Sequence, residues 1–121
     1  MKVIKHDEVS KQDATSAPLF YGGTVSRQPL VDSDMSKYFS FSIVTFDAGA
    51  KNKYHAHSSD QILLVTSGTG IVADERQEHI VTVGTTIHIP AGEKHWHGAT
   101  DDSDFSHISL TSADSQTEML G

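Results

Sequence analysis

The stretch from Lys53 to Val65, "KYHAHSSDQILLV", contains two histidines one residue apart, then a glutamine, then four consecutive apolar residues. Alternate residues of a β-strand point to the same side, so His55 and His57 project together, and Gln61 has the same parity. The unbroken apolar run predicts a strand whose two faces are both covered. The stretch therefore predicts a β-fold with nitrogen-rich side chains on an inner face. An acidic residue would hold a dication more tightly than Gln61, so the neutral amide requires an explanation.

The same apolar run predicts an oligomer. If the strand resumes in phase at Gln61, Leu63 and Val65 share its inner face, whereas Ile62 and Leu64 point outward. In so small a domain, a second copy of the chain is the cover that we expect for the outward side. The sequence therefore predicts a homo-oligomer, either a dimer or a tetramer.

Short strands separated by Gly and Pro turns account for most of the remaining chain. "KYFSFSIVTFDAG" (37–49) alternates apolar and polar residues, "TTIHIP" (85–90) ends a strand at a proline, and "DFSHISLTS" (104–112) forms one more strand. Many short strands with such turns predict a single all-β domain, a sandwich or a small barrel. We expect an N-terminal arm or edge strand over 1–18, a barrel over 19–112, and a C-terminal tail over 113–121 that is loose or a short helix.

Composition excludes several classes of function. The chain of 121 residues has no cysteine, which rules out disulfides, thiolate metal sites and cysteine nucleophiles. A net charge of −7 provides no basic footprint for nucleic acid. No apolar run is long enough to span a membrane, and the N-terminal residues lack the apolar region of a signal peptide, so we expect a cytoplasmic protein. The eight histidines are scattered along the chain, so they are not an expression tag.

Two spaced motifs carry a resemblance to a known family. Their fixed residues are Gly49, His55, His57, Gln61 and Gly68 in the first motif, and Gly84, Pro90, Gly92 and His95 in the second. The spacings resemble the paired signature motifs of the cupin superfamily, whose fold is a small antiparallel β-barrel of the jelly-roll type. The resemblance implies one divalent metal ion per chain inside the barrel, held by His55, His57, Gln61 and His95. Imidazole nitrogens suit manganese, iron, nickel and zinc in this role.

Two residues depart from the cupin pattern. The usual glutamate of the first motif is Gln61, and the asparagine that closes the second motif is Ala99. Three neutral imidazoles and a neutral amide leave the charge of a dication uncompensated by protein. We expect lower metal affinity but a stronger Lewis acid, which suits the stabilisation of negative charge on a substrate oxygen.

A narrower resemblance is to the bacterial manganese-dependent cupin hydroxynitrile lyases. It is carried by the three histidines and glutamine of the ligand set, by "GEKHWHGA" (92–99), by a histidine twelve residues beyond the last ligand, and by "FYGGTV" (20–25). It implies reversible cleavage of a cyanohydrin, a small-molecule substrate, to an aldehyde and hydrogen cyanide, with manganese as the expected metal. By position it implies that His97 and His107 are the acid-base groups and that Ser42, Val44 and Thr111 line the substrate pocket.

The same ligands also suit two other classes of function. Iron at this site would suit a redox cupin that activates dioxygen to cleave a small ketone or aromatic compound, because metal choice follows availability more than ligand identity. A non-enzymatic module that binds a sugar or a carboxylate would show a ligand-induced stability shift without turnover. Three further histidines receive no functional role: His6 and His79 are expected to be solvated, and His88, opposite in parity to its isoleucine neighbours, is expected to face outward.

Overall fold

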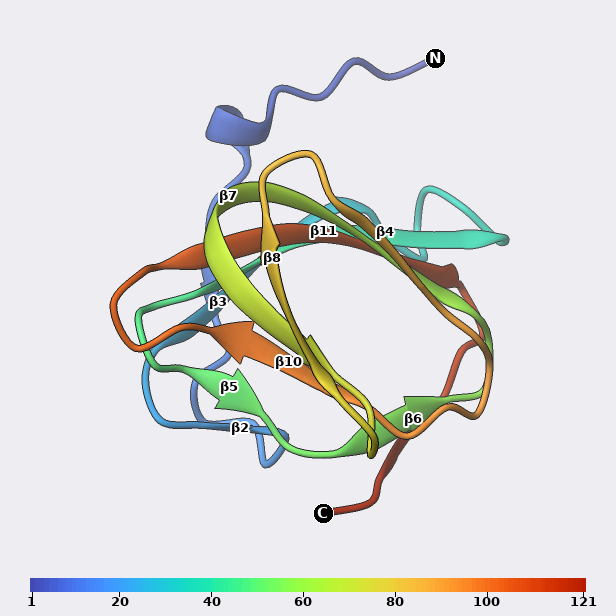
Figure 1. The fold of residues 1–121 in the computed structure, drawn as a ribbon. Coiled ribbons are helices and arrows are strands. Elements are labelled where there is room, and N and C mark those ends of the chain that lie inside the picture. The colour runs from blue at the N-terminus through green and yellow to red at the C-terminus, as the bar shows by residue number, and fades with distance from the viewer.

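In the computed structural model, which describes residues 1–121, the chain is built almost entirely from strands that curl around a central space (Figure 1). The elements in chain order are the 3-10 helix η1 (His6–Glu8) and the strands β1 (Gln12–Asp13), β2 (Phe20–Tyr21), β3 (Val25–Val31), β4 (Phe39–Phe46), β5 (Lys51–Asn52), β6 (His55–His57), β7 (Gln61–Ala73), β8 (Glu78–Thr82), β9 (Thr86–Ile89), β10 (Trp96–Ala99), β11 (Phe105–Ser112) and β12 (Thr117–Met119). The all-β fold expected from the sequence is confirmed. The structure contains no helix with the length and apolar character needed to cross a membrane.

The long strand β7 joins the two halves of the main sheet, whose strand order is β1-β3-β4-β11-β7-β10-β5-β2. The first part of β7, from Gln61, pairs with β11 and β9, and its last part, to Ala73, pairs with β10 and β8. Between them lies Gly68, whose φ of +73° is in the left-handed region that favours glycine. A Cβ atom at this position would collide with the carbonyl oxygen of Asp104. Gly68 therefore allows one strand to belong to both halves, which wraps the sheet around the interior.

Inward and outward positions alternate along β7 as the sequence predicts. Gln61, Leu63 and Val65 are buried, whereas Ile62 and Leu64 are 38% and 40% exposed. The parity prediction is confirmed, and it places the glutamine amide in the interior on the same face as two core residues.

The apolar core lies directly beside the interior histidines. Phe46 of β4 and Phe105 of β11 are fully buried and stack with their ring centroids 6.1 Å apart. The Phe46 ring also lies 5.8 Å from the rings of His97 and His107. Burial of each phenylalanine side chain contributes about 2–3 kcal/mol. The core therefore supplies a dry, rigid wall for the polar part of the interior.

The outer face of the sheet is covered partly by the N-terminal segment of the same chain. Leu30, Ile43 and Ile108 form a second buried cluster, against which Ile4 and Val9 pack. The N-terminal segment therefore covers the outer side over β3, β4 and part of β11, which is not the side of β7 for which a second copy is expected. The outward side chains of β7 remain exposed, and the homo-oligomer stays a prediction that light scattering on the purified protein would test.

The two ends of the chain are both paired to strands. Residues 12–13 form β1 at the sheet edge beside β3, so this part of the N-terminal segment is an edge strand. The expectation that the C-terminal tail is loose or a short helix is wrong for residues 117–119, which form β12 and pair antiparallel with β6. The reason is that β6 lies outside the main sheet, with one isolated bridge to His95, so its remaining backbone groups require partners from another segment.

Candidate metal centre and active-site cavity

Backbone pairing brings the two signature motifs together. His55 and His57 belong to β6, whereas His95 lies just before β10, forty residues after His55 in the chain. The backbone N–H of His55 donates to the carbonyl of His95 at 2.9 Å, and the reverse bond is 3.0 Å long. The ring centroids of these two residues are 4.3 Å apart, and the ring of His57 is 5.0 Å from that of His55. The three rings therefore converge on one point from two segments.

Hydrogen bonds to backbone oxygens fix the tautomers of two of these histidines. The Nδ1 of His55 lies 2.7 Å from the carbonyl oxygen of Lys53, and the Nδ1 of His95 lies 2.8 Å from that of Glu93. A carbonyl oxygen only accepts hydrogen bonds, so each Nδ1 carries the proton and each Nε2 presents a lone pair. An outer hydrogen bond of this kind is what orients a metal-binding histidine.

The lone pairs of the cluster face one another. The Nε2 of His95 lies 3.2 Å from Oε1 of Gln61, whose amide nitrogen donates to the Ser109 hydroxyl at 2.9 Å. The Nε2 of His57 is buried and has no hydrogen-bond partner, while its Nδ1 contacts the Thr117 hydroxyl at 3.1 Å. Two facing acceptors and one unpartnered nitrogen repel unless a cation lies between them. The donor set therefore fits a divalent metal that accepts imidazole and amide ligands.

His97 lies close to the cluster but is engaged elsewhere. A nitrogen of its ring falls within 4.8 Å of nitrogens of His55 and His95, so these three buried histidines together could hold a metal. However, Nε2 of His97 lies 3.2 Å from the Asn52 amide nitrogen, and its Nδ1 lies 3.2 Å from Nε2 of His107. Both ring nitrogens already have protein partners, which favours the ligand set expected from the sequence, with His97 outside it.

The three buried side chains Asn52, His97 and His107 form one hydrogen-bonded row. The backbone N–H of His97 donates to Oδ1 of Asn52 at 2.8 Å, so the amide nitrogen of Asn52 is directed at the imidazole and donates to its Nε2. The neutral ring of His97 then carries its proton on Nδ1 and donates to Nε2 of His107. The Nδ1 of His107 is left as the one nitrogen of the row with no hydrogen-bond partner. Because Nε2 of His107 accepts the hydrogen bond from His97, the Nδ1 of its neutral ring carries the proton, and the one lone pair of the ring lies on Nε2.

Burial keeps these imidazoles neutral. It lowers the pKa of His107 from 6.5 to about 4, and it lowers the pKa of His97 well below 6.5, with a smaller effect from the neighbouring His107. Burial, followed by the nearby His95, lowers the pKa of His55 to about 4. The pKa values of His57 and His95 are lowered mainly by burial too. Near pH 7 the interior therefore holds neutral bases and metal-binding lone pairs.

Acid is expected to destabilise the metal-free protein before its carboxylates titrate. A histidine whose folded pKa is depressed takes up its proton more readily when unfolded, so stability falls as the pH drops from about 6.5 to about 4. His107 alone accounts for about 3 kcal/mol of this loss. Urea unfolding at about pH 7 and about pH 4.5 measures the effect. Equal stability at the two pH values would show that the buried histidines are protonated without cost.

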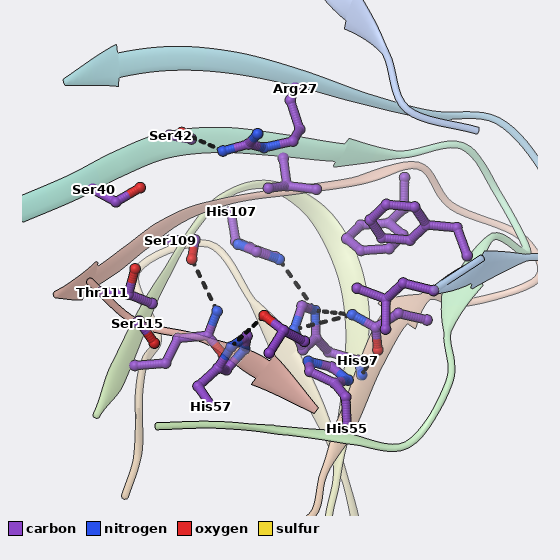
Figure 2. Close-up of a pocket in the computed structure, with 17 residues that line it drawn as sticks. Arg27, Ser40, Ser42, His55, His57, His97, His107, Ser109, Thr111 and Ser115 are labelled. Atoms are coloured by element: carbon purple, nitrogen blue, oxygen red, sulfur yellow. Dashed lines mark hydrogen bonds between the residues drawn. The ribbon is translucent and has the colours of Figure 1, made fainter. Parts of the chain in front are cut away.

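The histidines open into one cavity of about 340 Å³ (Figure 2). Its polar lining includes His55, His57, Gln61, His97, His107 and the hydroxyls of Ser40, Ser42, Ser109, Thr111, Ser115 and Thr117. Its apolar lining is Leu19, Phe20, Val44 and Phe46. Every predicted site residue except His95 lies in this lining. His95 is connected to it because its Nε2 lies 3.2 Å from Oε1 of Gln61, which does line the cavity. The three residues expected in the substrate pocket, Ser42, Val44 and Thr111, lie here as well.

Several residues of the cavity have no counterpart in the sequence-based interpretation, and two of them, Asn52 and Arg27, bear on its chemistry. Asn52 orients His97, and Arg27 lines the cavity from β3. Neither belongs to a spaced motif, and the only local signal is that Asn52 precedes the first ligand by three residues. The histidines without an assigned role, His6, His79 and His88, are exposed as expected, and His88 contacts the Asp60 carboxylate at 2.7 Å.

A curled β-barrel with converging, buried imidazole nitrogens defines a class of proteins able to hold a metal ion within the barrel. The chain belongs to the cupin family, since the family model "Cupin domain" matches residues 42–111. This places the observed barrel among the jelly-roll folds that the sequence motifs imply.

The chain is similar to several characterised or solved proteins. It is 32% identical over 92 residues to the (R)-mandelonitrile lyase of Granulicella tundricola, an alignment that covers 75% of this chain and 70% of that protein. A crystal structure of a cupin-like protein from Thermotoga maritima matches with a TM-score of 0.81 and 28% identity, over 100% of this chain and 90% of that one. The polyketide cyclase RemF from Streptomyces resistomycificus matches with a TM-score of 0.88 at 16% identity, over 100% and 86% of the two chains, which shows the fold alone. The resemblance to cupins, and among them to hydroxynitrile lyases, is confirmed.

Proposed function

We propose that this chain is a metal-dependent hydroxynitrile lyase, which cleaves a cyanohydrin to an aldehyde and hydrogen cyanide and catalyses the reverse addition. One observation carries the proposal: the neutral, hydrogen-bonded pair His97 and His107 lines the same cavity as the converging donors His55, His57 and Gln61. The 32% identity to an (R)-mandelonitrile lyase supports this choice among reactions open to a cupin.

The residues of the cavity divide the work of such a cleavage. A divalent metal, which we propose is manganese, supplies a Lewis acid for the substrate oxygen when held by His55, His57, Gln61 and His95. The lone pair on Nε2 of His107, released from its hydrogen bond to His97, takes the hydroxyl proton while the bond between the carbinol carbon and the nitrile carbon breaks. The bonding electrons leave with cyanide, and the histidine pair returns the proton to form hydrogen cyanide.

The rest of the lining suits the organic part of a small cyanohydrin. Val44, Phe20 and Phe46 offer apolar contact, and Phe46 also holds the catalytic imidazoles in place through ring contacts. The hydroxyls of Ser42 and Thr111 provide hydrogen bonds that can orient a polar substituent. The cavity of about 340 Å³ is large enough for a substituted benzene ring with a short side chain.

Reconstitution with single metals tests the proposal. Protein stripped of metal is reloaded with manganese or with iron and mixed with mandelonitrile without oxygen, at mildly acidic pH where spontaneous decay is slow. We expect benzaldehyde release, followed by absorbance, that depends on manganese and requires no oxygen. Release no faster than the buffer blank with any metal would reject lyase activity on this substrate. Turnover of a carbonyl or aromatic compound only in the presence of oxygen would point to the redox class instead.

The neutral amide of Gln61 is expected to trade metal affinity for reactivity. In Gln61→Glu, a carboxylate would offset part of the metal charge, so we expect tighter manganese binding and cleavage slower by about 10-fold or more. Metal titration and initial rates on mandelonitrile measure the two effects. Gln77→Glu, the same change on an exposed turn, serves as the control. A faster Gln61→Glu enzyme would contradict this explanation of the glutamine.

A further inference from the structure

The charge distribution inside the cavity is opposite to that of the whole chain. The protein has 16 acidic residues and a net charge of −7, yet no Asp or Glu lines the cavity. Arg27 is the one lining residue with a permanent charge. An acidic surface repels anions, so a cavity that excludes carboxylates and contains a guanidinium is the place where an anionic ligand is accepted.

The guanidinium of Arg27 is not neutralised by the protein. It forms no ion pair, and its one side-chain contact is a donated hydrogen bond of 3.1 Å from Nη2 to the Ser42 hydroxyl. Arg27 follows the buried Val25 by two residues on β3, so the two side chains share the inner face of the strand. Its exposed position at the cavity edge leaves most of its five N–H donors available. A planar guanidinium with free donors recognises a carboxylate through two parallel hydrogen bonds.

The position of Arg27 relative to the candidate metal centre sets the length of such a ligand. Figure 2 shows Arg27 and Ser42 on one side of the cavity and His55, His57 and His97 on the other. Ser42 is the cross-strand partner of Ser109, and Ser109 accepts a hydrogen bond from Gln61. Opposed residues on neighbouring strands have Cβ atoms about 5 Å apart, so one or two such spacings separate the guanidinium from the histidine cluster. A benzene ring or a short carbon chain bridges this separation.

We propose that the cavity selects small monocarboxylates that carry a carbonyl or hydroxyl group at the end remote from the carboxylate, and that Arg27 is the residue that determines this specificity. Arg27 binds the carboxylate, and Ser42 holds the guanidinium in position. The remote oxygen then lies beside Gln61 and the histidine cluster. One guanidinium with no second cationic side chain beside it suits a monoanion better than a phosphate dianion. The inference deepens the proposed function by naming the substrate class, and binding itself requires no turnover.

Calorimetry with a matched pair of ligands tests the inference. The probes are 4-(hydroxymethyl)benzoate and its neutral analogue 4-(hydroxymethyl)benzamide, titrated into the manganese-loaded protein. We expect the carboxylate to bind about 10-fold or more tightly than the amide, with a preference that weakens as salt is raised. In Arg27→Gln the preference should disappear, and Arg27→Lys should keep part of it. Arg76→Gln, which removes the only other arginine from an exposed turn, should leave the preference unchanged.

Each outcome is decisive. Equal binding of the two probes by the unmodified protein would overturn the inference. A carboxylate preference that persists in Arg27→Gln would overturn the role of Arg27, because the carboxylate would then be bound by the metal centre instead. Loss of the preference counts only if Arg27→Gln retains its thermal stability and its affinity for the amide. If the protein prefers the carboxylate but does not cleave cyanohydrins, the proposed lyase function is rejected and the role of Arg27 stands. If it cleaves cyanohydrins but shows no carboxylate preference, the lyase function stands and the role of Arg27 is rejected.

Discussion

His55→Ala is expected to lose both the metal ion and cyanohydrin cleavage. His55 is 1% exposed, its Nδ1 is fixed by the carbonyl of Lys53, and its backbone holds His95 through two hydrogen bonds. The site has no carboxylate, so each of its neutral donors carries a large share of the affinity. We expect less than about a tenth of the manganese content of the unmodified protein after dialysis, and a rate on mandelonitrile at the level of the buffer blank.

The measurement requires a control that removes a histidine from outside the site. His88→Ala removes an exposed imidazole that pairs with Asp60, a surface contact worth about 1 kcal/mol or less. It should retain metal and activity. His57→Ala, at a less buried ligand position, tests the same site with less risk to folding, and circular dichroism verifies that both variants are folded. Full manganese content in folded His55→Ala would place the metal elsewhere in the protein.

His107→Ala is expected to slow cleavage by about 10² to 10⁴-fold while the metal content stays unchanged. His107 is fully buried, and the one lone pair of its neutral ring lies on Nε2, which is hydrogen-bonded to His97 at 3.2 Å. Its loss removes the proton acceptor but none of the expected metal ligands. The readouts are kcat on mandelonitrile and manganese content by elemental analysis.

His107→Gln separates proton transfer from packing. Glutamine fills much of the same volume beside Phe46 and can still hydrogen-bond to His97, but it does not act as a base near pH 7. If proton transfer is the role of His107, both variants lose rate to a similar degree. Near-normal kcat in His107→Gln would reduce His107 to a packing residue and move the base to His97.

The shared face of three candidate ligands was predictable from sequence because its signal is local, whereas their role and the fourth ligand, His95, were implied by the resemblance to the cupin motifs. His55 and His57 share a face by strand parity, and the inward direction of Gln61 follows from the same period of two along β7. The spacing of glycines and a proline around both motifs reflects turns whose backbone geometry depends on those residues, as the left-handed conformation of Gly68 shows. Signals of this kind can be read from the sequence even when it is not known which strands pair.

The supporting residues were not predictable, because their roles arise from contacts between distant parts of the chain. Asn52 meets His97 across 45 positions, and Gln61 meets Ser109 across 48. A single asparagine or serine in a polar segment carries no local mark of such a contact. The partial cover of the outer face by the chain's own N-terminus was not predictable for the same reason, since this polar segment gave no sign that Ile4 and Val9 would pack there.

The resemblance of two spaced motifs to the cupins implied the set of candidate metal ligands. By itself, the sequence determined the all-β class and the inward face of β7. These depend on strand periodicity and on turn residues, which act over a few neighbouring positions. Only the tertiary structure decided that His97 and His107 form a buried neutral pair, that Arg27 carries an unpaired charge into the cavity, and that the C-terminal residues pair with β6. Each depends on burial and on strand register between segments far apart in the chain, which set the solvation and partners of a side chain and have no local signature.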